Sequence, residues 1–326
     1  MKNIGIDAAA VGMKPTKRRK KYAYGMDART QSELQVMVWP AMLFMILFNF
    51  LPLFGLIIAF TNYSPINGIA GIFDSAWNNF ANFMFVFKDV FFWPMIRNTL
   101  GINILGMIVG FPVTIMFAFL LNEIASQKFR SFIQTITYLP HFLSWVIYGG
   151  LIMNMLSPTT GVVNWLLLHL HLVHKPVEFM ANPKYFWGLA VTTGLLKDLG
   201  WGAILYLAAI AGVEQSQYEA AAIDGAGRFK RMWHITLPGI LGTVMIMVIF
   251  SISGILNNNF NQIYVLQNSL NLPTSQVIAT YVYQIGLQQF QFAYGTAVGL
   301  MNSVIALVLL VGSNLLSKKL TGKGLF

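Results

Sequence analysis

The sequence predicts an all-α integral membrane protein with six transmembrane helices. The chain has 326 residues, of which 56% are apolar and only 10% are charged, whereas about 25% of the residues of soluble proteins are charged. Crossing a bilayer takes about 20 mainly apolar residues, and six segments reach this length. We expect the spans at residues 36–60, 98–121, 132–156, 186–212, 240–257 and 294–316.

The distribution of basic residues predicts the orientation. An even number of spans places both termini on one side of the membrane. Most of the 21 Lys and Arg residues lie in the N-terminal tail, in the loops after the second and fourth spans, and near the C-terminus. Because cytoplasmic loops carry the excess of basic residues, both termini are expected in the cytoplasm. We therefore divide the chain into a basic tail (1–33), a membrane domain (34–320) and a C-terminal tail (321–326).

The distribution of basic residues and the absence of several motifs exclude some classes of function. Basic flanks of membrane helices account for the net charge of +10, so nucleic-acid binding is not expected. The chain has no cysteine, and it contains no phosphate-binding loop, HExxH or GxSxG pattern. His169, His171 and His174 have no carboxylate within their motif and are expected to form a surface cluster instead of a metal site. We expect a protein that is not an enzyme and that binds no cofactor itself.

One polar stretch, EAAAIDGAGRFKRMWHITLP at residues 219–238, interrupts the apolar sequence. Ser216 and Glu219 form a capping-box pattern, which predicts the start of a helix. Gly225 and Gly227 weaken its middle, so we expect two short helices with a bend. Asp224 and Arg228 have the spacing of a helical ion pair. Pro238 is expected to interrupt the helix before the fifth span.

This stretch is consistent with two kinds of element. An amphipathic helix could lie on the inner leaflet of the membrane. Alternatively, its small alanines could let the groove of a partner protein approach closely. A lipid-surface helix would need larger apolar residues where Ala220, Ala221 and Ala222 stand, so the alanines favour docking.

The stretch also resembles a known motif. Glu219-Ala220-Ala221, Gly225 and Ile235-Thr236-Leu237-Pro238 match the EAA motif of permease subunits of binding-protein-dependent ABC importers at every motif position. Residues 138–145, 200–203, 218–226 and 280–283 are similar to the branch that takes up complex oligosaccharides. The resemblance covers about residues 39–319.

The resemblance implies a type I ABC importer permease fold and a set of partners. Residues 214–238 would form a coupling helix that enters a cleft of a cytoplasmic ATPase, with a charged contact from Glu219 and a bend at Gly225. The implied partners are a second, related permease, two ATP-binding subunits that hold ATP and Mg²⁺, and an extracytoplasmic binding protein. The implied docking residues are Glu219, Ala220, Ala221, Asp224, Gly225, Ile235, Leu237 and Pro238.

An oligosaccharide path would use polar and aromatic side chains near the middle of the membrane. Candidates occur in the third, fourth and fifth predicted spans. The amide-rich stretch at 257–262 could instead cap a helix and form an outer loop. The candidates are Trp145, Tyr148, Asn154, Lys197, Trp201, Tyr206, Asn257, Asn258, Asn259 and Gln262.

Lys197 and Asp198 are the notable charges within a span, because a charge near the bilayer centre costs about 2.5–3.5 kcal/mol. Adjacent helical residues point about 100° apart, so each should have a different partner. Lys197 could extend to the outer headgroups, or it could bind an acidic sugar such as a uronate. Together the two residues could also serve as the relay of an ion-coupled secondary transporter, which is the alternative function.

Overall fold

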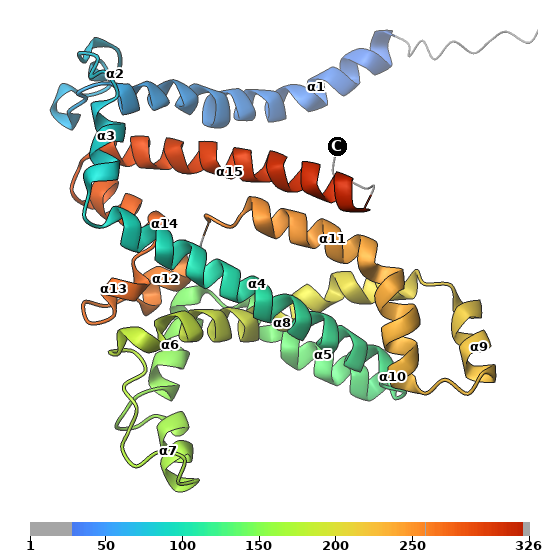
Figure 1. Ribbon diagram of the computed structural model, residues 1–326. Helices are drawn as coiled ribbons and strands as arrows, with labels where there is room; N and C mark the ends of the chain where they lie inside the picture. Colours follow the sequence, from blue (N-terminus) through green and yellow to red (C-terminus); the bar gives the residue numbers. More distant parts are fainter. Residues whose placement is uncertain (1–27, 258, 322–326) are drawn as a thin grey trace, which may run out of the picture. The chain divides into compact units, whose positions relative to one another are not determined.

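The computed structural model describes residues 28–257 and 259–321, which form helices joined by loops (Figure 1). An isolated antiparallel bridge between Thr61 and Trp77 is the only β pairing among these described residues. The chain divides into two units, residues 1–55 and residues 56–326.

The first unit contains the first apolar span. It comprises α1 (Ala28–Met45), the π-helix η1 (Ile46–Phe50) and the start of the 3₁₀-helix η2 (Leu51–Phe60). The apolar segment Ser32–Phe60 is long enough to cross a membrane, and most of its side chains are exposed, which suits contact with lipid or with another apolar helix. Residues 28–33 of the predicted tail already belong to α1, and the rest of that tail lies outside the described residues.

The second unit holds the other spans. Among the described residues of the whole chain, five helices are long and apolar enough to cross a membrane, or six if one bent pair counts as a single span. The prediction of an all-α membrane protein is therefore confirmed. The long helices of this unit are α4 (Phe92–Glu123), α8 (Phe186–Ala211), α11 (Leu237–Ser253) and α15 (Phe292–Thr321).

Shorter helices connect these spans. They are η3 (Pro65–Asn67), α2 (Gly71–Asp74), α3 (Ala81–Lys88), α5 (Gln127–Phe142), α6 (Trp145–Met155), α7 (Val162–His169), η4 (Pro183–Tyr185), α9 (Gln215–Ile223), α10 (Arg228–Arg231), η5 (Met232–Thr236), α12 (Phe260–Leu266), α13 (Leu272–Ser275), α14 (Ile278–Val282) and η6 (Tyr283–Gln288).

The third span is broken, so the prediction of one continuous helix at 132–156 is wrong. Its two parts, α5 and α6, meet at an angle of 106°. Pro140 lies in the last turn of α5, and the backbone of Leu143 is extended. Ser144 then starts α6, because its hydroxyl accepts a hydrogen bond from the backbone N–H of Ile147 at 3.3 Å, as N-capping serines do.

The fifth span begins earlier than predicted. α10, η5 and α11 follow one another without a break, so the apolar segment runs from Arg228 to Ser253. Pro238 therefore does not interrupt the helix. A proline inside a helix has no N–H and collides with the preceding turn. The π-helical turn η5 directly precedes α11, and its wider geometry accommodates Pro238 at the start of that helix.

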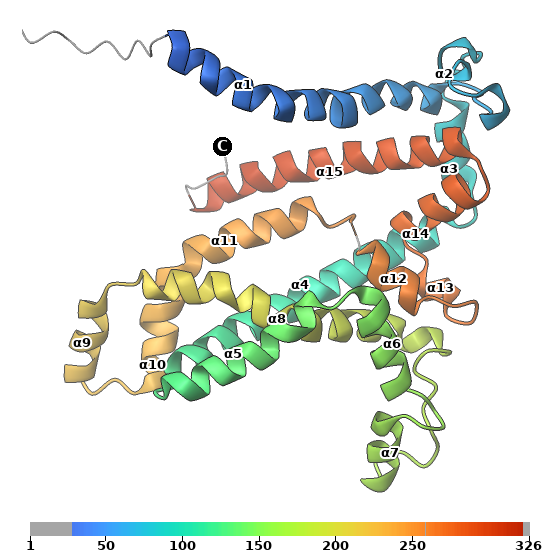
Figure 2. The same cartoon turned by 180° about the vertical axis from the view of Figure 1, so that it is seen from behind.

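The helices of the second unit lie largely side by side and leave two distinct ends (Figures 1 and 2). α9 and α10 lie at one end, near the end of α4. α6, α12 and α13 lie at the opposite end, where α7 extends away from the spans. A buried apolar cluster joins α4, α8 and α11 near the first end, through Phe119, Tyr206 and Ile240 among others. This packing supports both of the sites described below.

Candidate functional site

The polar loop between the fourth and fifth spans presents α9 as an exposed helix. Its N-cap residue is Glu214, and no side chain caps its first turn, so the predicted start at Ser216 is wrong. Every residue of α9 is exposed or half-buried, and Ile223 at its end is 87% exposed. α9 therefore presents a surface that the described residues leave uncovered.

The end of α9 explains the glycine in the motif. Gly225 has φ = +71°, a conformation that favours glycine. The N–H of Ala226 donates to the carbonyl of Ala221 at 2.8 Å, and the N–H of Gly225 donates to that of Ala222 at 3.1 Å. These two bonds form a Schellman motif. The predicted bend is confirmed, but only α9 is a short helix, because the helix that follows runs without a break from Arg228 to Ser253.

The two parts of the motif play different structural roles. Glu219, Ala220 and Gly225 are exposed, whereas Ile235 and Leu237 are half-buried. Leu237 packs against the apolar cluster of α4, α8 and α11. The first part therefore presents a surface, and the second part anchors the loop to the spans.

Two polar contacts fix the loop. The hydroxyl groups of Tyr218 and Thr236 lie 2.9 Å apart and join α9 to η5. Arg228 lies 3.6 Å from the carboxylate of Glu123 at the end of α4. The predicted ion pair between Asp224 and Arg228 is wrong, because α9 ends before Asp224 and the helical spacing is lost.

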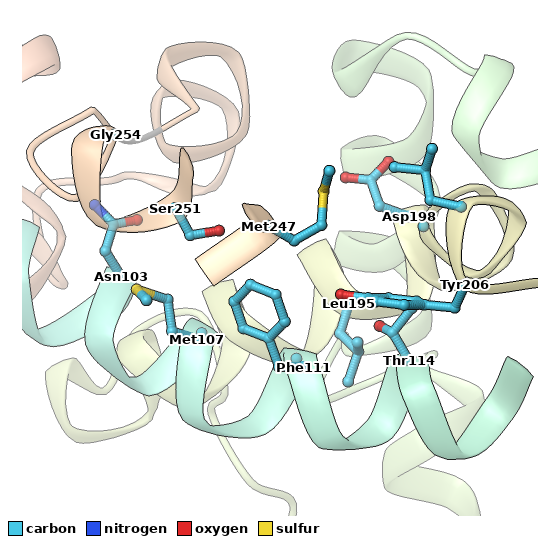
Figure 3. A pocket seen from close by; sticks show the side chains of 14 residues that line it. Asn103, Met107, Phe111, Thr114, Leu195, Asp198, Tyr206, Met247, Ser251 and Gly254 are labelled. Atoms are coloured by element: carbon cyan, nitrogen blue, oxygen red, sulfur yellow. The ribbon is translucent and has the colours of Figure 1, made fainter. Parts of the chain in front are cut away.

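A cavity of about 530 Å³ lies between α4, α8 and α11 (Figure 3). Met107, Phe111 and Met247 give it an apolar wall, and Asp198 is its only charged residue. Tyr206 is the only predicted substrate-path residue that lines it. The sequence analysis did not select its other polar side chains, which are Asn103, Thr114 and Ser251.

A second pocket of about 500 Å³ lies at the break between α5 and α6. Trp145, Lys197 and Asn259, all predicted substrate-path residues, are among its lining residues, together with His141. Asp198 lines both this pocket and the cavity of Figure 3. The side chain of Asp198 is therefore shared by the two spaces.

The side chain of Lys197 is buried at the helix break and bonds to its backbone. It is only 4% exposed, and its ammonium group donates to the carbonyls of Pro140, His141 and Leu143 at 2.8, 2.7 and 2.8 Å. An ammonium group has three donors, so all of them are used. The interpretation that Lys197 extends to headgroups is wrong, and no donor remains for a sugar carboxylate.

Two aromatic rings complete the surroundings of this ammonium group. Its nitrogen lies 5.6 Å from the ring centre of Trp145 and 5.8 Å from that of Tyr148, within the range of cation–π attraction. Carbonyls at a helix end lose their helical partners, and Lys197 donates to three carbonyls at the break, of which that of Pro140 also accepts from the N–H of Leu143.

Asp198 has a different partner, as predicted for adjacent residues of a helix. Its carboxylate lies 2.7 Å from Nδ1 of His141. The His141 ring stacks on Trp201, with 4.5 Å between the centres and 4° between the planes. A Cβ on Gly200 would lie 2.5 Å from the carbonyl oxygen of Thr137, so glycine allows α8 to approach α5 closely.

The remaining predicted path residues do not converge on one cavity. Tyr148 donates to the carbonyl of Thr193, and the side-chain amide of Gln262 donates to the carbonyl of Ala190, so both fix buried helix contacts. Asn154 and Asn257 are exposed. Asn259 caps the start of α12 through the N–H of Gln262, and Asn258 lies outside the described residues.

Comparison with known proteins places this architecture in the class of membrane permeases. Residues 102–322 match the family described as "Binding-protein-dependent transport system inner membrane component". The chain belongs to this family, and it is a multi-pass protein of the cytoplasmic membrane.

Three relatives extend the comparison along nearly the whole chain. Protein LplB of Bacillus subtilis is 40% identical over 90% of this chain and 91% of its own. The polygalacturonan/rhamnogalacturonan transport system permease protein YteP of B. subtilis is 36% identical over 100% of both chains. A chain of a bacterial alginate ABC transporter, solved in complex with an alginate pentasaccharide-bound periplasmic protein, is 34% identical, covers 91% of this chain and 98% of its own, and has a TM-score of 0.81. The resemblance to ABC importer permeases is confirmed.

Proposed function

We propose that this chain is the permease subunit of an oligosaccharide importer and that residues 214–238 couple it to an ATPase. The observation that carries the proposal is the construction of the loop. Its exposed helix α9 ends in a Schellman motif at Gly225 and is joined through Tyr218 to Thr236, which directly precedes α11 of the fifth span. A partner that moves α9 would thus move the spans.

The mechanism follows from two states of the assembly. Two ATPase subunits bind ATP and Mg²⁺, and their closure draws the coupling helices of two related permeases together. This change favours the outward-open state, to which an extracytoplasmic binding protein delivers the sugar. ATP shifts the equilibrium because the ATPases make different contacts with the loop in the two states. Both termini and the loop are then cytoplasmic, in agreement with the distribution of basic residues.

We infer that the substrate is an acidic oligosaccharide derived from alginate or pectin. Two relatives support this inference: YteP is a polygalacturonan/rhamnogalacturonan permease, and the solved relative transports alginate. Lys197 does not supply the carboxylate contact, because its three donors are bound to backbone carbonyls. The geometry also weakens the ion-relay alternative, since the ammonium group is held by groups that do not titrate.

Reconstitution of the whole complex in liposomes tests this function. The permease is combined with its partner permease, the ATPases and the binding protein, and ATP hydrolysis is measured with neutral and uronic oligosaccharides. We expect binding protein loaded with a uronic oligosaccharide to stimulate hydrolysis more than the unloaded protein. Sugar uptake that continues without any ATPase would contradict the proposal. Equal stimulation by neutral and uronic sugars would reject the acidic substrate alone.

A further inference from the structure

The pair formed by His141 and Asp198 is open to its surroundings, unlike the neighbouring Lys197. The exposed fractions of the two side chains are 30% and 51%. An ionised group that faces lipid within a span is costly, and such groups usually face a cavity or a partner. Both residues line the pocket at the helix break, and Asp198 also lines the cavity between α4, α8 and α11, so the open side of the pair faces these spaces.

The pair also lies beside two cavities of the second unit. Asp198 lines both the cavity between α4, α8 and α11 and the pocket at the helix break. Their volumes of about 530 and 500 Å³ fall within the range of about 300–1,000 Å³ that is typical of ligand pockets. A sugar bound in either space would lie beside Asp198.

Two contacts hold the His141 ring in one orientation, and a third holds its backbone. Its backbone carbonyl accepts a hydrogen bond from Lys197, its Nδ1 faces Asp198, and its ring stacks on Trp201. A carboxylate only accepts hydrogen bonds, so Nδ1 carries the hydrogen. The other ring nitrogen, Nε2, makes no hydrogen bond with any residue that the structure describes. It is the remaining polar atom of a fixed ring at the edge of a pocket.

We propose that His141 contacts the transported sugar through Nε2 and determines which oligosaccharides pass, with Asp198 and Trp201 as its positioning residues. In the neutral ring Nε2 is an acceptor, and it pairs with a sugar hydroxyl group. Trp201, which is partly exposed beside the stacked ring, extends this polar contact with an apolar surface. The proposal rests on the function proposed above.

The test uses the reconstituted complex and the substitution His141→Phe. Phenylalanine keeps an aromatic ring on Trp201 but removes both nitrogens. We expect the complex to assemble and sugar import to fall about three- to tenfold, as the loss of one hydrogen bond implies. The ranking of a panel of oligosaccharides and their deoxy analogues should also change. The wild type should import the analogue that lacks the contacted hydroxyl group more slowly than the parent sugar, and the variant should import both at the same rate.

Two matched variants act as controls. Val146→Ala alters the lining of the same pocket without removing a polar atom, and His174→Phe removes an exposed histidine outside the pocket. Both should keep the wild-type import rate and ranking. If His141→Phe does not assemble, the same comparison uses His141→Asn, whose amide can still donate to Asp198 but has no atom at the position of Nε2.

The outcomes separate this proposal from the proposed function. If loaded binding protein does not stimulate the wild-type complex, the importer function fails. If the wild type is stimulated and the His141 variant imports every sugar at the wild-type rate and ranking, the role of His141 is rejected. A uniform loss for all sugars together with lower abundance would also reject it, because that pattern indicates a structural role.

Discussion

The coupling loop and the break in the third span both place charged residues in an otherwise apolar chain, but they treat those charges in opposite ways. In the loop, Glu219 remains exposed, and the backbone is held by a Schellman motif and a hydroxyl contact. At the break, Lys197 is buried and its three donors are all used by carbonyls. Exposed charges remain available to a partner, whereas a fully bonded charge acts on the fold. The experiments below test this contrast.

The largest effect is expected from Lys197→Met. The substitution removes three hydrogen bonds at the break, and each carbonyl left without a partner costs about 1–3 kcal/mol. We expect a strong loss of thermal stability and of complex abundance, measured by thermal unfolding in detergent. Lys184→Met, at an exposed position of the outer loop, is the control and should change neither quantity.

The same substitution separates two roles of Lys197. If the lysine bound a uronate, Lys197→Met would fold normally and lose only the import of acidic sugars. A stable variant with that selective defect would refute the structural role.

Charge reversal in the loop should weaken binding of the ATPase without lowering stability. Glu219→Lys is expected to weaken ATPase binding roughly tenfold or more, as the loss of a charged hydrogen bond implies, while thermal stability stays unchanged because the side chain is exposed. The measurement is the dissociation constant of the ATPase for the permeases in nanodiscs. Gln217→Lys, also exposed on α9, is the matched control, and a similar loss there would show that added charge alone weakens the complex.

The bend of the loop can be tested separately from its charge. Gly225→Val forces a β-branched residue into a left-handed conformation, which costs about 1–2 kcal/mol. We expect reduced stimulation of ATP hydrolysis with normal insertion into the membrane. Gly227→Val is the control, because Gly227 has φ = −66° and open space around its Cβ position. Equal activity of the two variants would mean that coupling does not need the bend.

The smallest effect is expected for Tyr218→Phe. This change removes only the hydroxyl contact between α9 and η5, which is worth about 0.5–1.5 kcal/mol. Stimulated ATP hydrolysis should fall a few-fold, and ATPase binding should remain. If binding were lost and coupling kept, the contact would support the docking surface instead of transmitting motion.

The same contrast explains what the sequence could predict. Spans follow from local composition, and the bend at Gly225 follows from local glycine chemistry, so both were predictable. The break in the third span was not predicted, because residues 132–156 are apolar on both sides of Pro140 and Ser144. Its stabilising partner, Lys197, lies on another helix.

The candidate substrate path was the hardest part to predict. Lys197 and Asp198 drew attention as charges in a span, and their separate partners followed from helical geometry. The contact between His141 and Asp198 joins positions 57 residues apart, and no local pattern indicates it. Cavity residues such as Asn103 and Ser251 are single polar residues within apolar spans, so only the packing of α4, α8 and α11 identifies them.

The most direct test of the docking surface is the accessibility of α9 in the assembled complex. The chain has no cysteine, so Ala220→Cys introduces a single thiol on this helix. We predict that a maleimide reagent labels this thiol in the permeases alone and that the ATPases protect it. A bifunctional maleimide should then link it to an ATPase subunit that carries a cysteine in its cleft. Equal labelling with and without the ATPases would contradict the assignment of α9 as the coupling helix.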